Sequence, residues 1–206
     1  MTNNEQRIHI IDDDEGIRQG LNLLFETVGL PCQLYHSAND FLVQYNSDLR
    51  GCLIVDIRMP GISGLELQEK LIEMESTLPI IFISGHGDIP MAVEAMRHGA
   101  LDFIRKPFRE QDILDRINEA LTQEMLTHQY RLEHQALLDK IASLSLREKQ
   151  IFMKVAAGEM NKSIAIDLEI SERTVEVHRS QVMKKLKVRT LAQLVNLKLQ
   201  SELTQP

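Results

Sequence analysis

The sequence lacks several features, and each absence excludes a class of protein. No apolar run approaches the roughly 20 residues that cross a bilayer, and residues 1–6 lack the basic and apolar regions of a secretion signal. There are only two cysteines, Cys32 and Cys52, and they form no metal-ligand pattern. We interpret them as buried reduced thiols. The sequence therefore predicts a cytoplasmic protein without a membrane partner.

The phosphate-binding loop of nucleotide-binding proteins, GxxxxGK[ST], is also absent. A phosphoryl donor is therefore not expected to bind this chain as a nucleotide. What is present is ordinary for a globular protein, with 43% hydrophobic and 26% charged residues. A length of 206 residues is too great for one small domain and fits two.

The net charge of −7 is divided unevenly along the chain. Residues 1–120 carry 20 acidic and 10 basic side chains, whereas residues 121–206 carry 10 acidic and 13 basic ones. An acidic first half and a basic second half suggest two functions, the second of them on a polyanion. The alternative is a solvated helix end, where cations are favourable. The densest basic cluster is Lys184, Lys185, Lys187 and Arg189.

Short apolar runs and amphipathic helical patterns alternate through about the first 120 residues. Five strands followed in turn by five helices predict an α/β fold with a doubly wound five-stranded parallel sheet, because right-handed crossovers place helices on both faces. The third run is unbroken and ends at Asp56, as expected for a strand that is buried on both sides. The predicted strands are residues 8–11, 31–36, 52–55, 79–84 and 101–104.

Polar side chains follow four of these strands where each one ends. They are Asp12 and Asp13, Asp56, Ser84, and Lys106. A single acid at a strand end is more often a plain turn into solvent. The carboxyl ends of parallel strands meet at one rim, where open α/β sheets bind their ligands. Four strand ends with complementary chemistry therefore predict a functional site.

Three carboxylates on one rim repel one another unless a cation joins them. Mg²⁺ suits an all-oxygen cluster, because it is a hard ion that shares its ligands with phosphate. In such a site Asp56 can attack a phosphoryl group, while Mg²⁺ and Lys106 neutralise the phosphoryl oxygens and Ser84 donates a hydrogen bond. No general base is needed, because a carboxylate is ionised at neutral pH.

Residues 7–122 resemble the receiver domain of two-component response regulators. The matching segments are IIDDD, IVDIRMPGISG, FISGHGD and DFIRKPF. The resemblance implies that Asp56 accepts phosphate from a sensor histidine kinase. It also implies that Mg²⁺ is held by Asp13, Asp56 and the carbonyl of Arg58, with Asp12 acting through water.

The same resemblance implies that Ser84 and Phe103 form a switch pair. After phosphorylation Ser84 is expected to move to the phosphoryl group and Phe103 to turn inward. The peptide bond Lys106–Pro107 is expected to be cis, which proline tolerates. Asp14 is an additional acid with only a weak claim to the metal.

Arg58 and His86 occupy two variable positions that flank the phosphoryl site. We hypothesise that they set the lifetime of the acyl phosphate, because bulky side chains there could order or exclude the attacking water. For His86 a plain exposed loop residue is an equal alternative.

Residues 123–143 contain neither Gly nor Pro, which favours a helical linker that continues the fifth helix of the first domain. The apolar positions keep no clean heptad, so a coiled coil is not favoured. In residues 144–206 helix starts recur, with Ser145, Asn161 and Ser171 as expected caps. Four short helices with a tight turn between the second and the third predict an all-α helix-turn-helix domain.

The third of these helices has an outward face that could read DNA. If Val175 and Val182 are buried, helical geometry turns Arg173, Glu176, Val177, Ser180 and Lys184 outward. Glu, Val and Ser side chains can contact base edges, whereas lysines suit phosphates. Plain solvent exposure is the alternative. The phosphate candidates are Lys162, Lys184, Lys185 and Lys187.

Residues 144–200 resemble the LuxR-type output domain of the NarL/FixJ class, in the segments LSLREKQIF, AAGEMNKSIA and LEISERTVEVHRSQVMKKLKV. The receiver segment GHGDIPMAVEAM is similar to the FixJ branch. The match implies that Lys162 and Thr174 touch the DNA backbone. It places at or beside the groove Glu176, Val177, His178, Arg179 and Ser180, although His178 could be partly in the core.

The predicted function is that of a phosphorylation-dependent DNA-binding transcription regulator. One small domain offers few phosphate contacts, so a homodimer on two half-sites of double-stranded DNA is expected, with RNA polymerase as a further partner. The first alternative is a Mg²⁺-dependent phosphohydrolase that passes through an aspartyl phosphate, although Arg58 stands where such enzymes usually have an acid. The second is a DNA-binding module that does not respond to phosphate.

Overall fold

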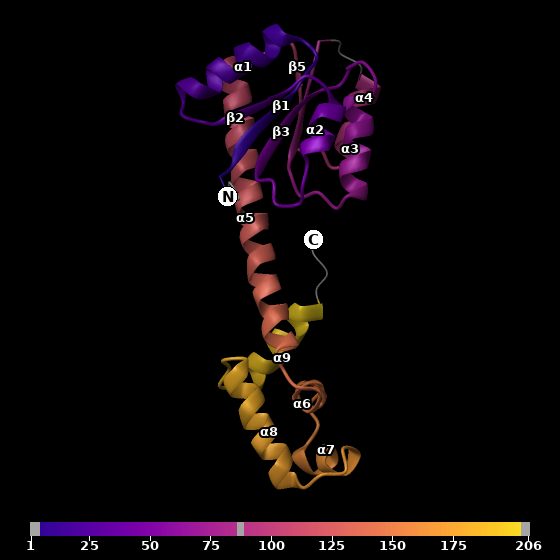
Figure 1. The fold of residues 1–206 in the computed structure, drawn as a ribbon, viewed down its shortest axis with the longest axis vertical. Coiled ribbons are helices and arrows are strands. Elements are labelled where there is room, and N and C mark those ends of the chain that lie inside the picture. The colour runs from indigo at the N-terminus through magenta and orange to yellow at the C-terminus, as the bar shows by residue number, and fades with distance from the viewer. Residues whose placement is uncertain (1–4, 86–88, 203–206) are drawn as a thin grey trace. The chain divides into compact units, whose positions relative to one another are not determined.

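The computed structural model describes residues 5–85 and 89–202, which Figure 1 shows as a ribbon. The chain divides into two compact units, residues 1–127 and residues 128–206. In chain order the elements are β1 (Arg7–Ile11), α1 (Glu15–Thr27), β2 (Cys32–Tyr35), α2 (Ala38–Gln44), β3 (Gly51–Asp56), α3 (Gly64–Glu73), β4 (Ile80–Ser84), α4 (Ile89–Arg97), β5 (Asp102–Arg105), α5 (Glu110–Ala142), α6 (Leu146–Ala156), α7 (Asn161–Asp167), α8 (Glu172–Lys185) and α9 (Leu191–Glu202).

A five-stranded parallel sheet forms the centre of the first unit, with the strand order β2-β1-β3-β4-β5. The central strand is β3, and all of its residues from Gly51 to Asp56 are buried. A strand that is covered on both faces has no reason to alternate, which explains the unbroken apolar run in the sequence. The predicted doubly wound parallel sheet is confirmed.

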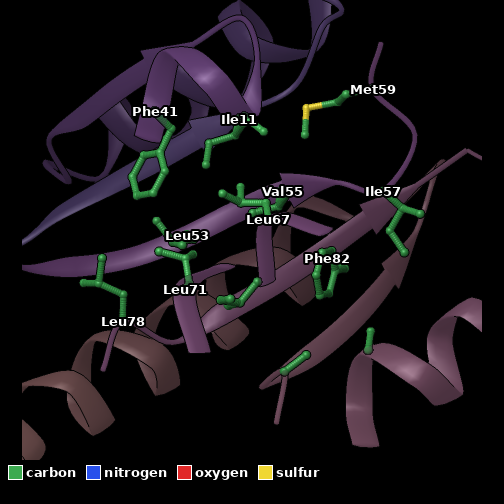
Figure 2. Packing of buried hydrophobic residues seen from close by; sticks show 14 of the residues in the cluster. Ile11, Phe41, Leu53, Val55, Ile57, Met59, Leu67, Leu71, Leu78 and Phe82 are labelled. Atoms are coloured by element: carbon green, nitrogen blue, oxygen red, sulfur yellow. The ribbon is translucent and has the colours of Figure 1, made fainter. Parts of the chain in front are cut away.

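Alternate residues of each strand point to opposite faces, and so the sheet has two apolar layers. In one layer Val55 and Phe82 pack with Leu67 of α3, together with residues of α2 and α4; Figure 2 shows this packing. In the other layer Ile54 packs with Ile117 of α5 and with residues of α1. Helices therefore cover both faces of the sheet and leave the carboxyl ends of the strands at one rim.

Helix α5 is unbroken over 33 residues, which is about 50 Å at the usual rise of an α-helix. Its continuation through residues 123–142 agrees with the absence of Gly and Pro there. The composition alone does not reveal which side chains are buried. Glu124 is only 4% exposed, whereas Met125 and Leu132 are about half exposed, at 48% and 58%.

Helices α6 to α9 have an apolar core of their own, which includes Ile151, Phe152, Val175 and Val182. Ser145 accepts a hydrogen bond from the backbone N–H of Glu148, whose side chain accepts one from the Ser145 N–H, so the predicted cap at Ser145 is present and forms a capping box. Helices α7 and α8 form the predicted helix-turn-helix, since α7 ends at Asp167 and α8 begins at Glu172.

The caps of these two helices differ from each other. Ser171 caps α8 as predicted, because its side chain accepts from the Thr174 N–H. The predicted cap of α7 is wrong: Met160 holds that position, and no side chain there accepts a cap hydrogen bond. Asn161 is instead the first helical residue, and its Oδ1 accepts from Nη1 of Arg179 at 3.0 Å. A polar contact between helices thus replaces the local cap.

Candidate functional site

Polar residues from four strand ends meet at the carboxyl rim of the sheet, as predicted. Asp12 follows β1, Asp56 ends β3, Ser84 ends β4 and Lys106 follows β5. Asp12, Asp56 and Ser84 are 1%, 7% and 4% exposed. The backbone N–H of Lys106 donates to the carbonyl of Ser84 at 2.7 Å, which ties the last two strand ends together. Asp12, Asp56 and Ser84 are therefore buried polar residues and not parts of a solvated loop.

Lys106 joins the two buried carboxylates. Its Nζ donates to Oδ2 of Asp12 and to Oδ1 of Asp56, each at 2.7 Å. Burial alone would lower the pKa of Lys106, but the hydrogen bonds to both carboxylates outweigh burial and raise it. For Asp12 burial prevails and raises the pKa, although the bond from Lys106 opposes this. With both carboxylates ionised, one ammonium faces two negative charges.

Backbone contacts fix the carboxylate of Asp56 and the turn after it. The Arg58 N–H donates to Oδ2 of Asp56 at 2.7 Å, and the Gly64 N–H donates to the Ile57 carbonyl at 2.9 Å. A Cβ atom on Gly64 would lie 2.5 Å from the Asp56 carbonyl oxygen, closer than such contacts allow. Only glycine at position 64 permits helix α3 to begin this near the strand end.

The other acids of the IIDDD segment take separate roles. Asp13 is exposed, whereas Asp14 caps α1 by accepting from the N–H groups of Gly16 and Ile17. Helix capping thus gives the third acid a structural role. Sequence reasoning missed Arg18, whose Nη1 donates to the Asp12 carbonyl at 2.7 Å. In the sequence, this contact is indicated only by a basic residue in the first turns of the helix that follows the acids.

The metal-binding residues implied by the resemblance are not gathered into a ready cluster. Within residues 5–85 and 89–202, no group of three or more Asp, Glu, His or Cys side chains stands close enough to hold a metal ion. The donor chemistry nevertheless suits Mg²⁺, because the candidate atoms are all oxygens and Lys106 balances only one of the two buried charges. The candidate ligands are Asp12, Asp13, Asp56 and the Arg58 carbonyl.

Most of the other positions implied by the receiver resemblance lie within the described residues. Phe103 on β5 is partly buried and packs against the layer that contains α4. The Lys106–Pro107 bond is cis, as the resemblance implied. Arg58 is exposed, whereas His86 lies outside the described residues, so its place beside the site stays a prediction.

Helix α8 presents the outward face that the sequence predicts. Val175 and Val182 are buried in the core of the second unit. Arg173, Glu176, Val177, Ser180 and Lys184 are exposed. Val177, an apolar side chain on this face, is 51% exposed. Lys162 on α7 is exposed as well.

Four other DNA-binding candidates either hydrogen-bond within the unit or are partly buried in it. Arg179 is partly buried and donates to Asn161, and the partly buried His178 has an Nδ1 atom that is buried without a hydrogen-bond partner in the structure. Lys185 donates from Nζ to the buried carboxylate of Glu148 at 2.7 Å. Thr174 is partly buried, and its Oγ1 lies 2.8 Å from Oγ of Ser171. Thr174, Arg179 and Lys185 therefore make contacts that support α8 within its own unit.

Two protein families match this chain. The family described as response regulator receiver domain matches residues 8–118, and the family described as bacterial regulatory proteins, luxR family, matches residues 142–197. None of the helices in the described part of the chain is long and apolar enough to span a membrane.

Full-length relatives share both parts. The response regulator protein TmoT of Ectopseudomonas mendocina is 45% identical over 195 residues, which is 95% of this chain and 89% of TmoT. The transcriptional regulatory protein FixJ of Rhizobium meliloti is 42% identical, over 93% of this chain and 94% of FixJ. The solved structure of the response regulator StyR has a TM-score of 0.86 at 42% identity and covers 95% of this chain and 98% of StyR. The chain therefore belongs to the NarL/FixJ class of response regulators, which are phosphorylation-dependent transcription regulators that combine a receiver with a LuxR-type DNA-binding domain.

Proposed function

We propose that Asp56 is the phosphoacceptor of this regulator and that its phosphorylation controls DNA binding by α8. The single observation that carries the proposal is the position of Lys106, whose ammonium contacts the carboxylates of Asp56 and Asp12 at the rim of the sheet. A buried carboxylate beside a fixed cation is suited to attack on phosphorus. The receiver would span residues 1–122, the helical linker 123–143 and the output domain 144–206.

The transfer itself needs no general base. A carboxylate oxygen of Asp56 bonds to the phosphorus of a phosphohistidine on a sensor histidine kinase, while the phosphorus–nitrogen bond breaks and the imidazole keeps its electron pair. Lys106 neutralises charge on the phosphoryl oxygens, and the Ser84 hydroxyl donates to one of them. Water later cleaves the acyl phosphate, which releases inorganic phosphate and restores Asp56. The chain thus acts on itself and turns over no separate substrate.

Mg²⁺ is the proposed cofactor, since receiver domains generally use it for phosphorylation. Asp13, Asp56 and the Arg58 carbonyl would hold the ion, with Asp12 acting through water. Their all-oxygen chemistry and the negative charge left by Asp12, Asp56 and Lys106 favour a hard cation. When bound, the ion would supply positive charge opposite the phosphoryl oxygens.

Ser84 and Phe103 are the proposed switch. Ser84 is buried at the end of β4, and Phe103 is partly buried on the neighbouring strand. A Ser84 hydroxyl drawn to the phosphoryl group would vacate space for the Phe103 ring. Phosphorylation would then favour one of two existing receiver conformers and not create a new one.

DNA recognition is assigned to α8 and its neighbours. Glu176, Val177 and Ser180 would meet base edges in the major groove, because they lie on the exposed face. Lys184, together with Lys162 and Thr174, would contact phosphates, which give affinity without sequence preference. His178 and Arg179 would lie beside the groove, and Arg179 would keep the helix in place through its hydrogen bond to Asn161.

The active form is proposed to be a homodimer on double-stranded DNA with two half-sites, because one helix-turn-helix buries too little surface for high specificity. RNA polymerase would be the partner through which bound DNA affects transcription. A protein with these partners acts in the bacterial cytoplasm, where the chromosome lies.

Binding of the full chain to an operator fragment, measured with and without beryllofluoride and Mg²⁺, tests this function. We expect beryllofluoride to increase the affinity for DNA in the wild type and to have no effect in Asp56→Asn. Identical binding curves for the wild type, with dimerisation also unchanged, would mean that the module ignores phosphate. Multiple turnover of a small phosphate ester would instead indicate a phosphohydrolase.

A further inference from the structure

A buried ion pair lies at the end of β3 opposite the phosphoacceptor site. Arg50 immediately precedes the strand, and Glu124 lies on α5. The guanidinium of Arg50 donates from Nε to Oε1 and from Nη2 to Oε2 of Glu124, the second at 3.0 Å. The side chains are 11% and 4% exposed. This is a bidentate pair that is almost fully withdrawn from water.

Further polar groups complete a network around this pair. Nε2 of Gln6 donates to Oε2 of Glu124 at 2.6 Å and to the Leu121 carbonyl at 2.8 Å. The Arg50 carbonyl lies 3.2 Å from Nε2 of the buried His9. The segment before β1, the start of β3 and one turn of α5 are thus joined through hydrogen bonds to one buried carboxylate.

A buried ion pair is a weak source of stability but a strong geometric constraint. Removal of one partner leaves an uncompensated charge in the interior, whereas a neutral pair of similar shape is often tolerated. Neither family match includes Glu124, because the receiver match ends at residue 118 and the LuxR match begins at residue 142. The constraint therefore acts on the segment that connects the two matched domains.

Strand β3 connects this ion pair to the proposed phosphoacceptor site and is well suited to hold the two at a fixed distance. All residues of β3, from Gly51 to Asp56, are buried. A Cβ on Gly51 would lie 1.8 Å from the Arg7 carbonyl oxygen, so β1 and β3 are closely fitted next to Arg50. One rigid strand thus has the phosphoacceptor at its carboxyl end and the hold on α5 at its amino end.

We infer that Arg50 and Glu124 are positioning residues that fix the linker part of α5 to the receiver sheet, and that the effect of phosphate on DNA binding depends on them. The inference rests on the proposed phosphorylation of Asp56. Residues after Glu124 continue the same helix as far as Ala142 without Gly or Pro. A helix that frays at residues 121–124 would no longer follow a change in the receiver.

The test uses the full chain with Glu124→Gln, the double variant Arg50→Gln/Glu124→Gln, and Glu119→Gln as the control. Glu119 lies on the same helix, but its side chain is 53% exposed and pairs with Arg116. We would measure amide hydrogen exchange along α5, the rate of Asp56 phosphorylation by acetyl phosphate, and DNA affinity with and without beryllofluoride.

In Glu124→Gln the amides of residues 121–127 should exchange about tenfold faster or more, because local opening becomes easier. The gain in DNA affinity caused by beryllofluoride should be lost, while the rate of Asp56 phosphorylation stays within about twofold of the wild type. The double variant should restore both exchange protection and the beryllofluoride response, because an amide pair leaves no buried charge. Glu119→Gln should match the wild type.

Unchanged exchange in Glu124→Gln, or faster exchange with a full beryllofluoride response, would overturn the inference. A failure of the double variant to restore the response would do so as well. If the wild type itself ignores beryllofluoride, the proposed function fails, and the signalling part of this inference fails with it. The exchange measurement then still shows whether the pair holds the helix, so the two failures are distinguishable.

Discussion

Nζ of Lys106 lies 2.7 Å from Oδ1 of Asp56 and at the same distance from Oδ2 of Asp12. The cation that directly follows the last strand of the sheet therefore stands between the acid that follows the first strand and the acid that ends the third. The arrangement keeps two buried carboxylates together before any phosphate arrives. If Asp56 is the phosphoacceptor, as proposed, the arrangement also places the ammonium where charge would develop on the attached phosphoryl group.

Replacement of Lys106 by Met should slow the phosphorylation of Asp56 by about a hundredfold, the usual cost of removing one electrostatic stabiliser of a transition state. The pKa of Asp12 should also rise further, because burial is then unopposed by the ammonium. The rate of acetyl-phosphate-dependent phosphorylation at saturating Mg²⁺ measures the first effect. Lys140→Met, at an exposed position on α5, is the control. An unchanged rate in Lys106→Met would exclude Lys106 from the transfer.

Gly64→Ala should both destabilise the receiver and slow phosphorylation. The new Cβ would lie 2.5 Å from the Asp56 carbonyl oxygen and 3.1 Å from the ring of Phe82, and overpacking of this kind costs about 1–3 kcal/mol. Gly20→Ala is the matched control, because nothing lies within 4 Å of a Cβ at that helical position. It should stabilise the chain by about 0.5–1 kcal/mol. Urea unfolding gives both free energies, and equal values for the two variants would contradict the prediction.

His9 should make the stability of the receiver depend on pH. Burial lowers its pKa to about 4 from 6.5, so the unfolded chain binds more protons between these values. Stability is then complete above about pH 6.5 and falls as the pH drops toward 4, by up to about 3 kcal/mol. Urea unfolding between pH 7.5 and pH 5 should show this slope. The slope of stability against pH should weaken in His9→Gln but persist in His36→Gln, where the side chain is exposed. Equal slopes in the two variants would count against a role of His9 in the pH dependence.

The sequence was sufficient to predict the sheet and its rim because both depend on local patterns. Buried strands read as apolar runs, and the polar residue after each run falls at the same edge. Asp12, Asp56, Ser84 and Lys106 were therefore found without coordinates. The same holds for the exposed face of α8, since burial of Val175 determines by helical geometry which neighbours face outward.

What could not be predicted depends on contacts between distant segments. Glu124 reads as a solvated helix residue until Arg50, 74 positions away, is placed beside it. Asn161 resembles a helix cap in sequence, yet its side chain accepts from Arg179 on the next helix. Lys185 belongs to a basic cluster in the sequence, but its ammonium donates to the buried carboxylate of Glu148. In each case local propensity is overruled by a tertiary partner that spacing does not reveal.

Arg58→Ala is predicted to change the lifetime of the phosphoryl group on Asp56. The Arg58 backbone N–H donates to Oδ2 of Asp56, and its side chain is exposed, so the substitution should change how water reaches the acyl phosphate without altering that bond. Decay of the phosphorylated full chain, with and without the substitution, measures the effect. If Arg58→Ala and His86→Ala both leave the half-life unchanged, these two positions do not tune hydrolysis.

Lys184 and Lys185 are adjacent in sequence but should have different roles. Lys184 is exposed and has no salt bridge among the residues that the structure describes. Lys184→Ala should therefore weaken DNA binding about equally for all sequences and reduce the slope of log affinity against log salt by about 0.9. Fluorescence anisotropy at several salt concentrations measures this slope for each variant.

Lys185→Ala should mainly affect folding, because Lys185 is the partner of buried Glu148. The hydrogen bond from Lys185 is the largest cause that lowers the pKa of Glu148 to about 2. A carboxyl with a lowered pKa stabilises the fold above its unfolded value near 4.5, and that stability is lost as the pH falls toward 2. The variant should thus be less stable at pH 7, with a smaller further loss in acid. Its salt slope for DNA should stay near the wild-type value; a slope reduced as in Lys184→Ala would show that Lys185 leaves Glu148 to bind phosphate.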